Sequence, residues 1–215
     1  MTSLSIVIIN YNGEQFLKPC IDSVIAQKNF GHELTIIVID NNSTDHSIDI
    51  LNKYDANITL ISNKTNTGFA RAVNQSLPYV NTDYIWLLNN ETEFSHNDDI
   101  LSPIISYLNQ HDDVVGLSPK LLNTDGSLQS QGSALNSFVY RSKKVREVSF
   151  LSGAALFVRT DFFKQIGGFD DELFFYNDDI DFAKQVKKYR KKLIYFPTVH
   201  VTHHGGLSTK FVPID

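Results

Sequence analysis

Short apolar runs alternate with amphipathic segments along the first half of the chain. Four runs have the length of a strand buried on both faces, at residues 4–9, 34–39, 58–61 and 84–88. The segments that follow the first three runs place apolar residues at helical spacing, over residues 16–25, 48–54 and 69–77. This alternation predicts an α/β fold with a mostly parallel, Rossmann-like central sheet and helices on both of its faces.

Two features refine where the first helices begin. Pro19 fits best in the first turn of a helix, because it has no N–H to donate. We therefore expect the first helix to begin near Phe16 rather than at Glu14. Ser43 or Thr44 is expected to cap the helix over residues 48–54, since a hydroxyl oxygen accepts from the free N–H groups there.

The second half of the chain is less regular. Apolar patterns predict a helix over residues 100–108, a strand over residues 114–117 and a further strand in the stretch 151–158, with Gly153 just ahead of it. Residues 126–147 are polar, rich in Ser and Gln and poorly periodic, so we expect a mobile excursion or an irregular hairpin over the site. Because the sequence has no internal repeat and no low-complexity linker, it is predicted to form one domain.

Candidate chemistry first occurs where the run at residues 84–88 ends in Asn89-Asn90-Glu91. The carboxyl ends of parallel strands are the usual ligand-binding edge of an open α/β sheet. The Asn89 oxygen and the Glu91 carboxylate are hard ligands suited to Mg²⁺ or Mn²⁺, which in turn can hold phosphates. The alternative interpretation is a polar turn that ends a strand.

A second candidate is the acidic cluster Asp178, Asp179 and Asp181, which lies where a helix is predicted to begin. Carboxylates stabilise a helix N-terminus, so these residues can be explained as helix-capping acids. The functional alternative is a general base, because crowding and partial desolvation raise the pKa of a carboxylate. The sequence leaves both interpretations open.

A third candidate is the pair His203 and His204, which follows a predicted strand over residues 199–202. The two side chains would point to opposite sides. Imidazole is a common metal ligand, so one of them could complete a site with Glu91. Zinc is less suited, because the chain has no cysteine pair and no His-Glu-x-x-His motif.

Composition limits the class of protein. With 215 residues, of which 42% are hydrophobic, the chain is long enough for one sizeable domain. Its single cysteine excludes an intrachain disulfide, and no segment resembles a signal peptide or a membrane span, so we expect a cytoplasmic protein. The sequence also lacks the glycine motifs typical of nicotinamide dehydrogenases and P-loop nucleotidases.

The net charge of −5 is unevenly distributed. Residues 1–100 contain 5 Lys and Arg against 12 Asp and Glu, whereas residues 101–215 contain 14 against 12. The basic run at residues 184–192 indicates either a solvated helix face or a surface for anionic lipid or a charged acceptor. The acidic overall balance argues against a nucleic-acid partner.

Taken in order, the motifs of this sequence resemble those of the family 2 glycosyltransferases of the type A fold. They are most similar to the rhamnosyltransferase-like branch, which builds bacterial surface polysaccharides. The resemblance covers residues 4 to about 209, with markers that include Val-Ile-Asp-Asn-Asn-Ser-Thr-Asp (38–45), Asn-Thr-Gly-Phe-Ala-Arg-Ala-Val-Asn (66–74), Leu-Leu-Asn-Asn-Glu-Thr (87–92), Gly-Gly-Phe-Asp (167–170) and His-His-Gly-Gly-Leu-Ser (203–208). It implies a nucleotide-binding half, residues 1–95, and an acceptor and catalytic half, residues 96–215, with a small mixed sheet on the acceptor side.

The resemblance implies inverting transfer of a sugar from a nucleoside diphosphate donor, of the UDP or dTDP type. The acceptor would be a hydroxyl of a saccharide or a lipid-linked saccharide. The residues implied in nucleotide and donor binding are Tyr11, Asn12, Asp40, Arg71, Asn89 and Gly153. Within this set, Asp40 would accept a nucleobase N–H, and Gly153 would lie against the donor sugar.

The resemblance also implies a metal site and a general base. Asn89 and Glu91 occupy the family's Asp-x-Asp place, where Mg²⁺ or Mn²⁺ is held against the diphosphate, and His203 matches a nearby histidine. Asp178 and Asp179 match the family's Glu-Asp pair, whose second acid deprotonates the acceptor. This sequence departs from the branch's usual Asn-Pro-Asp at residues 89–91 and shortens the first acid of the pair.

Two other functions stay open at this point. The altered metal motif is compatible with a non-catalytic nucleotide-sugar binding domain that has a regulatory or scaffolding role, although a pure binder has no need of a base. A two-domain hydrolase using His203 and Asp179 is less well supported, because the sequence has no nucleophile elbow. For a transferase, the basic residues 184–192 would allow peripheral contact with the inner face of a membrane.

Overall fold

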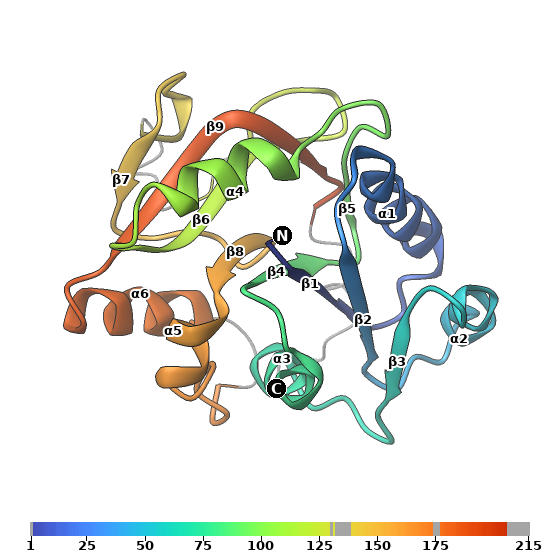
Figure 1. Cartoon of the computed structure of the whole chain (residues 1–215). Coiled ribbons are helices and arrows are strands. Elements are labelled where there is room, and N and C mark those ends of the chain that lie inside the picture. Colours follow the sequence, from blue (N-terminus) through green and yellow to red (C-terminus); the bar gives the residue numbers. More distant parts are fainter. Residues whose placement is uncertain (1, 130, 132–138, 174–176, 206–215) are drawn as a thin grey trace.

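The computed structural model describes residues 2–129, 131, 139–173 and 177–205. The strands among these residues form one nine-stranded sheet in the order β3-β2-β1-β4-β8-β6-β9-β5, with β7 paired to β9 (Figure 1). The protein is a mixed α/β fold with a mostly parallel central sheet, as the alternation of strands and helices predicts.

The first half of the chain forms the parallel part of the sheet. Its strands are β1 (Leu4–Asn10), β2 (Leu34–Asp40), β3 (Thr59–Ser62) and β4 (Tyr84–Asn89), which confirms the four predicted apolar runs. All three pairings among them are parallel, and the register sets Asn10 beside Asp40 and Ile9 beside Asn89. The polar ends of three strands therefore meet at one edge of the sheet.

The second half adds strands of both directions to the same sheet. They are β5 (Thr92–Glu93), β6 (Val114–Leu122), β7 (Arg146–Val148), β8 (Ala155–Arg159) and β9 (Lys192–His203). Strand β8 is antiparallel to β4, with Ala155 opposite Leu88, and β5 is antiparallel to β9, with Thr92 opposite His203. These two pairings bring residues far along the chain back to the end of β4.

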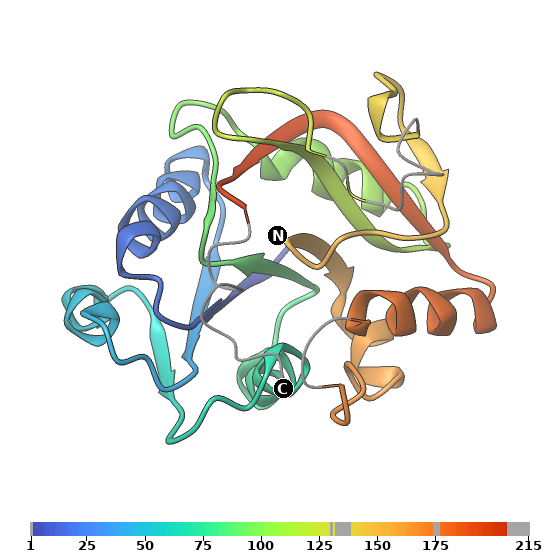
Figure 2. The same cartoon turned by 180° about the vertical axis from the view of Figure 1, so that it is seen from behind.

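Helices cover both faces of the sheet. One buried cluster contains residues of α1 (Glu14–Ala26), α2 (Ser47–Leu51) and α4 (Leu101–Asn109), packed on side chains such as Ile6 and Trp86. The other contains residues of α3 (Phe69–Ser76), α5 (Thr160–Gln165) and α6 (Asp178–Lys188), packed on side chains such as Val7. In both views, α1 and α2 lie at the β3 end of the sheet, and α6 lies at the opposite end (Figures 1 and 2).

The predicted start of the first helix is wrong. Helix α1 begins at Glu14, and Pro19 lies inside it. Two residues distant in sequence fix this start: the Asp45 carboxylate accepts from the Glu14 N–H at 3.0 Å, and the Ser47 hydroxyl accepts from the Gly13 N–H at 3.2 Å. These bonds satisfy N–H groups that have no partner within the helix, so the helix forms although Pro19 removes one internal donor.

The predicted cap of the second helix is also wrong. Helix α2 begins at Ser47, whose N–H donates to Asp45 Oδ1 at 3.0 Å. Ser43 is not available as a cap because its hydroxyl donates to Asp40 Oδ1 at 2.6 Å. Thr44 instead donates its N–H to the Asn12 side chain at 2.8 Å.

The polar segment at residues 126–147 lies partly outside the described residues. Its described beginning is a hairpin turn after β6, in which Leu122 bridges to Leu128 and the Gln129 N–H donates to the Leu121 carbonyl at 3.0 Å. Its described end is a short 3₁₀ turn (Val139–Arg141) followed by β7. None of the helices in the described part of the chain is both long and apolar enough to cross a membrane.

Candidate active site

Asp40 ends β2 in a buried network of hydrogen bonds. Its side chain is 1% exposed, and Oδ1 accepts from Asn10 Nδ2 at 2.7 Å and from the Ser43 hydroxyl at 2.6 Å. Oδ2 accepts from the Ser43 N–H at 2.9 Å. Because a carboxylate has about four acceptor positions, these three bonds leave one position on Oδ2 for a further donor.

Asn90 connects this network to the end of β4. The Asn90 side chain is buried, and its Nδ2 donates to Asn10 Oδ1 at 2.6 Å. Gly13 makes room for this contact, because a Cβ added there would lie 1.9 Å from Asn90 Nδ2 and 2.5 Å from Asn10 Oδ1. The predicted nucleotide-binding residue Asp40 and the predicted metal motif at residues 89–91 are thus joined through Asn10.

Asn12 holds the loops after β1 and β2 together. It adopts a left-handed backbone conformation, with φ of 49°. Its N–H donates to the Ser43 hydroxyl at 2.9 Å, and its side-chain oxygen accepts from the Thr44 N–H at 2.8 Å. Tyr11, the preceding residue, is half-buried beside these loops. This pair of loops forms the polar edge to which the predicted nucleobase-binding residues belong.

Arg71 lies on the exposed face of α3. Its guanidinium donates to the Asp171 carbonyl at 3.2 Å, and the neighbouring Asn74 side chain exchanges hydrogen bonds with the backbone of Phe169. Within the described part of the chain, Arg71 therefore joins α3 to the loop that precedes α6. It does not contact Asp40 or the motif at residues 89–91.

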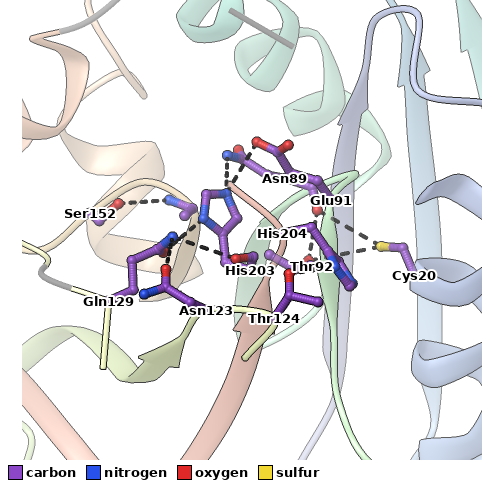
Figure 3. Close-up of polar contacts among 11 residues, drawn as sticks. Cys20, Asn89, Glu91, Thr92, Asn123, Thr124, Gln129, Ser152, His203 and His204 are labelled. Atoms are coloured by element: carbon purple, nitrogen blue, oxygen red, sulfur yellow. Dashed lines mark hydrogen bonds and ion pairs between the residues drawn. The ribbon is translucent and has the colours of Figure 1, made fainter. Parts of the chain in front are cut away.

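The three predicted metal ligands converge at the end of β4 (Figure 3). Asn89 Nδ2 lies 3.2 Å from His203 Nε2, and Glu91 Oε1 lies 3.3 Å from the same nitrogen. The side chains of Glu91 and His203 are 3% and 11% exposed. The antiparallel pairing of β5 with β9 produces this convergence, because it sets His203 opposite Thr92.

The donor set suits a hard divalent cation. A carboxylate, an amide oxygen and a neutral imidazole nitrogen are all ligands of Mg²⁺ or Mn²⁺ sites. To bind a cation, Asn89 would turn its amide so that Oδ1 faces inward, since its Nδ2 now donates to His203. The described residues contain no cluster of three or more His, Cys, Asp or Glu that could hold a metal, so this site depends on the amide of Asn89.

His204 faces away from this group. Its Nε2 lies 3.2 Å from Glu93 Oε2, and its Nδ1 lies 3.3 Å from the Thr124 hydroxyl. Its ring stacks on Phe16 of α1, with 5.3 Å between ring centroids. Of the two adjacent histidines, the structure therefore brings His203 and not His204 to Asn89 and Glu91.

The predicted catalytic acids begin α6. Burial and, second, the charge of Asp179 raise the pKa of Asp178 to about 6. Burial also raises the pKa of Asp179, whereas hydrogen bonds from the N–H groups of Ile180 and Gly153 oppose the rise. The pKa values of both carboxyls therefore lie above the ordinary value of an aspartate, with burial as the main cause.

Gly153 links the acids to the metal group. A Cβ built on Gly153 would lie 3.6 Å from Asp178 Oδ2 and 3.6 Å from the Phe69 ring, which is ordinary contact, so this glycine is not required for space. The next residue, Ala154, accepts from the Asn89 N–H at 3.0 Å. The predicted catalytic residues and the predicted metal ligands thus both contact one short segment before β8.

The high pKa of Asp178 predicts a pH-dependent effect of Asp178→Asn on stability. In the folded protein this carboxyl binds a proton below about pH 6, against an ordinary value of 3.8, so its stabilising contribution is complete below about pH 4 and is lost as the pH rises through 6. Above pH 6 the buried charge costs at most about 3 kcal/mol, at 1.36 kcal/mol per pKa unit. Asp178→Asn should therefore raise the free energy of unfolding at about pH 8 and change it little at about pH 4, as measured by urea unfolding. An equal change at both pH values would contradict the assignment.

The structure adds residues that the sequence did not single out. Gln129 accepts a hydrogen bond from His203, and Asn10, Ser43 and Asn90 complete the network around Asp40. Ser43 and Asn90 lie inside motifs that carried the resemblance, 38–45 and 87–92, so position alone could have suggested them. Gln129 lies in a polar segment without periodicity, and no signal in the sequence pointed to it.

Comparisons with known proteins agree on one family. A family model described as "Glycosyl transferase family 2" matches residues 5–167. The chain is also 24% identical, over 212 residues, to the N-acetylglucosaminyl-diphospho-decaprenol L-rhamnosyltransferase of Mycobacterium tuberculosis. That alignment covers 82% of this chain and 68% of the relative.

Solved structures show the same fold. The TarS structure from S. aureus, residues 1–349, superimposes with a TM-score of 0.73 at 17% identity and covers 94% of this chain and 60% of its own. The mannosyltransferase PcManGT from Pyrobaculum calidifontis, in complex with GDP-Man and Mn²⁺, gives a TM-score of 0.72 at 14% identity and covers 95% of this chain and 57% of its own. This chain thus spans less than two thirds of each of these structures. At such identities the likeness establishes the fold, that of type A glycosyltransferases.

Proposed function

We propose that this chain, which belongs to glycosyltransferase family 2, catalyses inverting transfer of a sugar from a nucleoside diphosphate sugar to a hydroxyl of a saccharide or lipid-linked saccharide. The observation that carries the proposal is that both groups, the predicted metal ligands and the predicted catalytic acids, contact the segment at residues 152–154. The Asn89 N–H donates to the Ala154 carbonyl beside Glu91 and His203, and the Gly153 N–H donates to Asp179. A transferase needs both groups, because one must stabilise the leaving diphosphate and the other must activate the acceptor.

The nucleotide would bind along the ends of β1 and β2. Asp40 Oδ2 retains one acceptor position after its bond to Ser43, and we assign that position to the N–H of a uracil or thymine base. Tyr11 and Asn12 belong to the adjacent loop, where Tyr11 can cover the base. Arg71 would have to exchange its bond to the Asp171 carbonyl for one to the donor diphosphate.

Asn89, Glu91 and His203 would hold the divalent cation. When bound, Mg²⁺ or Mn²⁺ supplies positive charge that stabilises the negative charge developing on a leaving diphosphate. Through that cation, the same three residues would hold the donor's diphosphate near the end of β4. The mannosyltransferase in complex with GDP-Man and Mn²⁺ has this fold, which supports the choice of ion.

Asp179 would act as the general base. As the acceptor oxygen attacks the anomeric carbon, its proton passes to the Asp179 carboxylate, and the bond between the anomeric carbon and the diphosphate oxygen breaks with its electron pair on the diphosphate. Attack from the face opposite the leaving group inverts the configuration. Asp178 lies beside it at the start of α6, where the charge of Asp179 raises the pKa of the Asp178 carboxyl.

We also propose that the basic end of the molecule contacts an anionic membrane from the cytoplasmic side. Residues 139–148 and 184–192 contain ten of the 19 Lys and Arg residues but one of the 24 Asp and Glu residues. The pairing of β7 with β9 places the two segments at the same end of the sheet (Figure 2). Exposed Ile180 on α6 and Tyr189 directly after α6 add apolar contact area. Co-sedimentation with phosphatidylserine vesicles, lost in high salt and with phosphatidylcholine alone, measures this contact.

Calorimetric titration tests the proposed transferase directly. UDP and dTDP are each titrated with Mn²⁺, with Mg²⁺ and with a chelator. Metal-dependent binding of one nucleotide is expected, followed by acceptor-dependent release of that nucleotide from its sugar donor. Binding without release in the presence of saccharide acceptors would favour a non-catalytic binding domain. Absence of binding under every condition would refute the donor site.

A further inference from the structure

The two adjacent histidines each connect the same two segments (Figure 3). One segment is the hairpin after β6, residues 122–129, and the other is residues 90–93, the turn after β4 together with β5. His203 lies between Gln129 of the hairpin and Glu91 of the turn, whereas His204 lies between Thr124 and Glu93. Only the His203 ring reaches Asn89, so the two bridges have different consequences.

Gln129 is held in one orientation by its own contacts. Its Nε2 donates to Asn123 Oδ1 at 3.1 Å and lies 3.5 Å from the His203 carbonyl oxygen. Both neighbours are acceptors, so the amide nitrogen belongs on that side. The Gln129 oxygen then faces His203 Nδ1 at 2.8 Å and can only accept from it.

Two acceptors near the His203 ring favour different tautomers, because each would accept a proton from a different ring nitrogen. Gln129 Oε1 at Nδ1 favours the tautomer with a proton on Nδ1, and Asn89 Nδ2 supports it by donating to Nε2. Glu91 Oε1, 3.3 Å from Nε2, favours the opposite tautomer, because a carboxylate is the stronger acceptor. Without Gln129, Glu91 would be the acceptor that determines the tautomer of His203.

We propose that Gln129 is a positioning residue that keeps the neutral His203 ring in the Nδ1–H tautomer, with the lone pair of Nε2 directed at Asn89 and Glu91. An imidazole binds a metal through a nitrogen that carries no proton, and the partner of the other nitrogen sets which one that is. The role of this tautomer rests on the proposed function, because the Nε2 lone pair would face the proposed divalent cation. The tautomer itself is a property of the metal-free protein.

The test compares three variants by two-dimensional ¹H–¹⁵N NMR of the histidine rings in metal-free protein, at about pH 8.5, where imidazole is neutral. The His203 signals are assigned by their absence in His203→Asn. The unmodified protein is expected to show the Nδ1–H tautomer, and Gln129→Leu should convert His203 mainly to the Nε2–H tautomer. Gln129→Glu keeps an acceptor at the same place and should restore Nδ1–H. An Nε2–H ring in the unmodified protein, or an unchanged ring in Gln129→Leu, would overturn the proposal.

Gln131→Leu is the matched control, because it removes another glutamine two residues further along the chain. Gln131 is buried, accepts from the Ser118 hydroxyl at 2.9 Å and donates to the Pro119 carbonyl at 2.7 Å, away from His203. This variant should lower thermal stability without changing the His203 tautomer. A tautomer change in Gln131→Leu would show that general loosening accounts for the effect and would overturn the specific role of Gln129.

Titration with Mn²⁺, followed by electron paramagnetic resonance, separates this inference from the proposed function. Gln129→Leu is expected to weaken Mn²⁺ binding by about 10- to 100-fold, the usual effect of removing the partner of a ligating histidine. If the tautomers behave as expected and the unmodified protein binds no Mn²⁺, the positioning role stands and the proposed metal site is wrong.

Discussion

Asp179→Asn is expected to lower the rate of sugar transfer by about 10²- to 10⁴-fold, the usual contribution of a general base. The amide keeps the size of the side chain and can still accept from the N–H groups of Ile180 and Gly153, so the fold and the donor site should persist. Donor affinity should therefore change by no more than a few fold. Steady-state transfer assays and calorimetric titration of the nucleotide measure the two quantities separately.

Asp181→Asn is the control for this experiment. Asp181 lies in the same first turn of α6, so its replacement removes a similar favourable charge at the helix N-terminus. Transfer by Asp181→Asn should remain within a few fold of the unmodified protein. Equal loss of transfer in both variants, or parallel loss of transfer and donor binding in Asp179→Asn, would refute the assignment of Asp179 as the base.

Glu91→Gln is expected to abolish most of the metal dependence of nucleotide binding. The substitution removes the negative charge of the proposed cation site while retaining the shape of a side chain that is 3% exposed. Loss of a direct ligand should weaken Mn²⁺-supported binding by about 100-fold or more, since even indirect partners of metal ligands contribute 10- to 100-fold. Binding measured with chelator should be unchanged, because the nucleobase contacts are separate.

Glu93→Gln supplies the comparison for this second variant. Glu93 lies two residues away and contacts His204 instead of His203, so it tests whether any charge on this turn matters. Its metal-supported binding should equal that of the unmodified protein. If Glu91→Gln binds nucleotide normally with and without Mn²⁺, the cation is held elsewhere and the proposed site is wrong.

The strands of the fold were predictable because of how they are buried. Strands β1, β2 and β4 lie between two layers of helices, so both faces of each strand are apolar and the sequence shows continuous runs. The length of strand β6 was underestimated. The prediction ended at residue 117, whereas the strand continues to Leu122 through Ser118, Pro119 and Lys120. Strand β8 begins at Ala155, just after Gly153 as predicted, because Gly153 and Ala154 form a turn beside Asn89.

Helix starts were less predictable because partners distant in sequence decide them. Local rules placed the start of the first helix by Pro19 and the cap of the second by Ser43 or Thr44. The structure instead uses Asp45 and Ser47, which reach across from one loop to the next. The N–H and hydroxyl of Ser43 both donate to the Asp40 carboxylate, and these hydrogen bonds depend on the conformation of the turn after β2.

The candidate site was likewise predictable from the sequence only in part. Motif order identified Asn89, Glu91 and His203, and the pairing of β5 with β9 brings these three residues together. Their roles, like those of the donor-binding and catalytic residues, stay predictions. Gln129 could not be found from sequence, since its importance comes from an amide orientation fixed by Asn123 and a ring far along the chain.

The thiol of Cys20 can be used to detect transient separation of helix α1 from the turn between β4 and β5. Cys20 is the single cysteine of the chain, and its buried Sγ lies 3.8 Å from the Asn89 carbonyl oxygen and 3.9 Å from the Thr92 hydroxyl, directly beneath the turn between β4 and β5. Burial raises the pKa of this thiol to about 12, so a thiol reagent can modify it only when α1 separates from the turn. Any ligand that binds the closed form makes such separations rarer in proportion to its occupancy. The rate of thiol labelling therefore ranks nucleotides, ions and acceptors by affinity without an assay of sugar transfer.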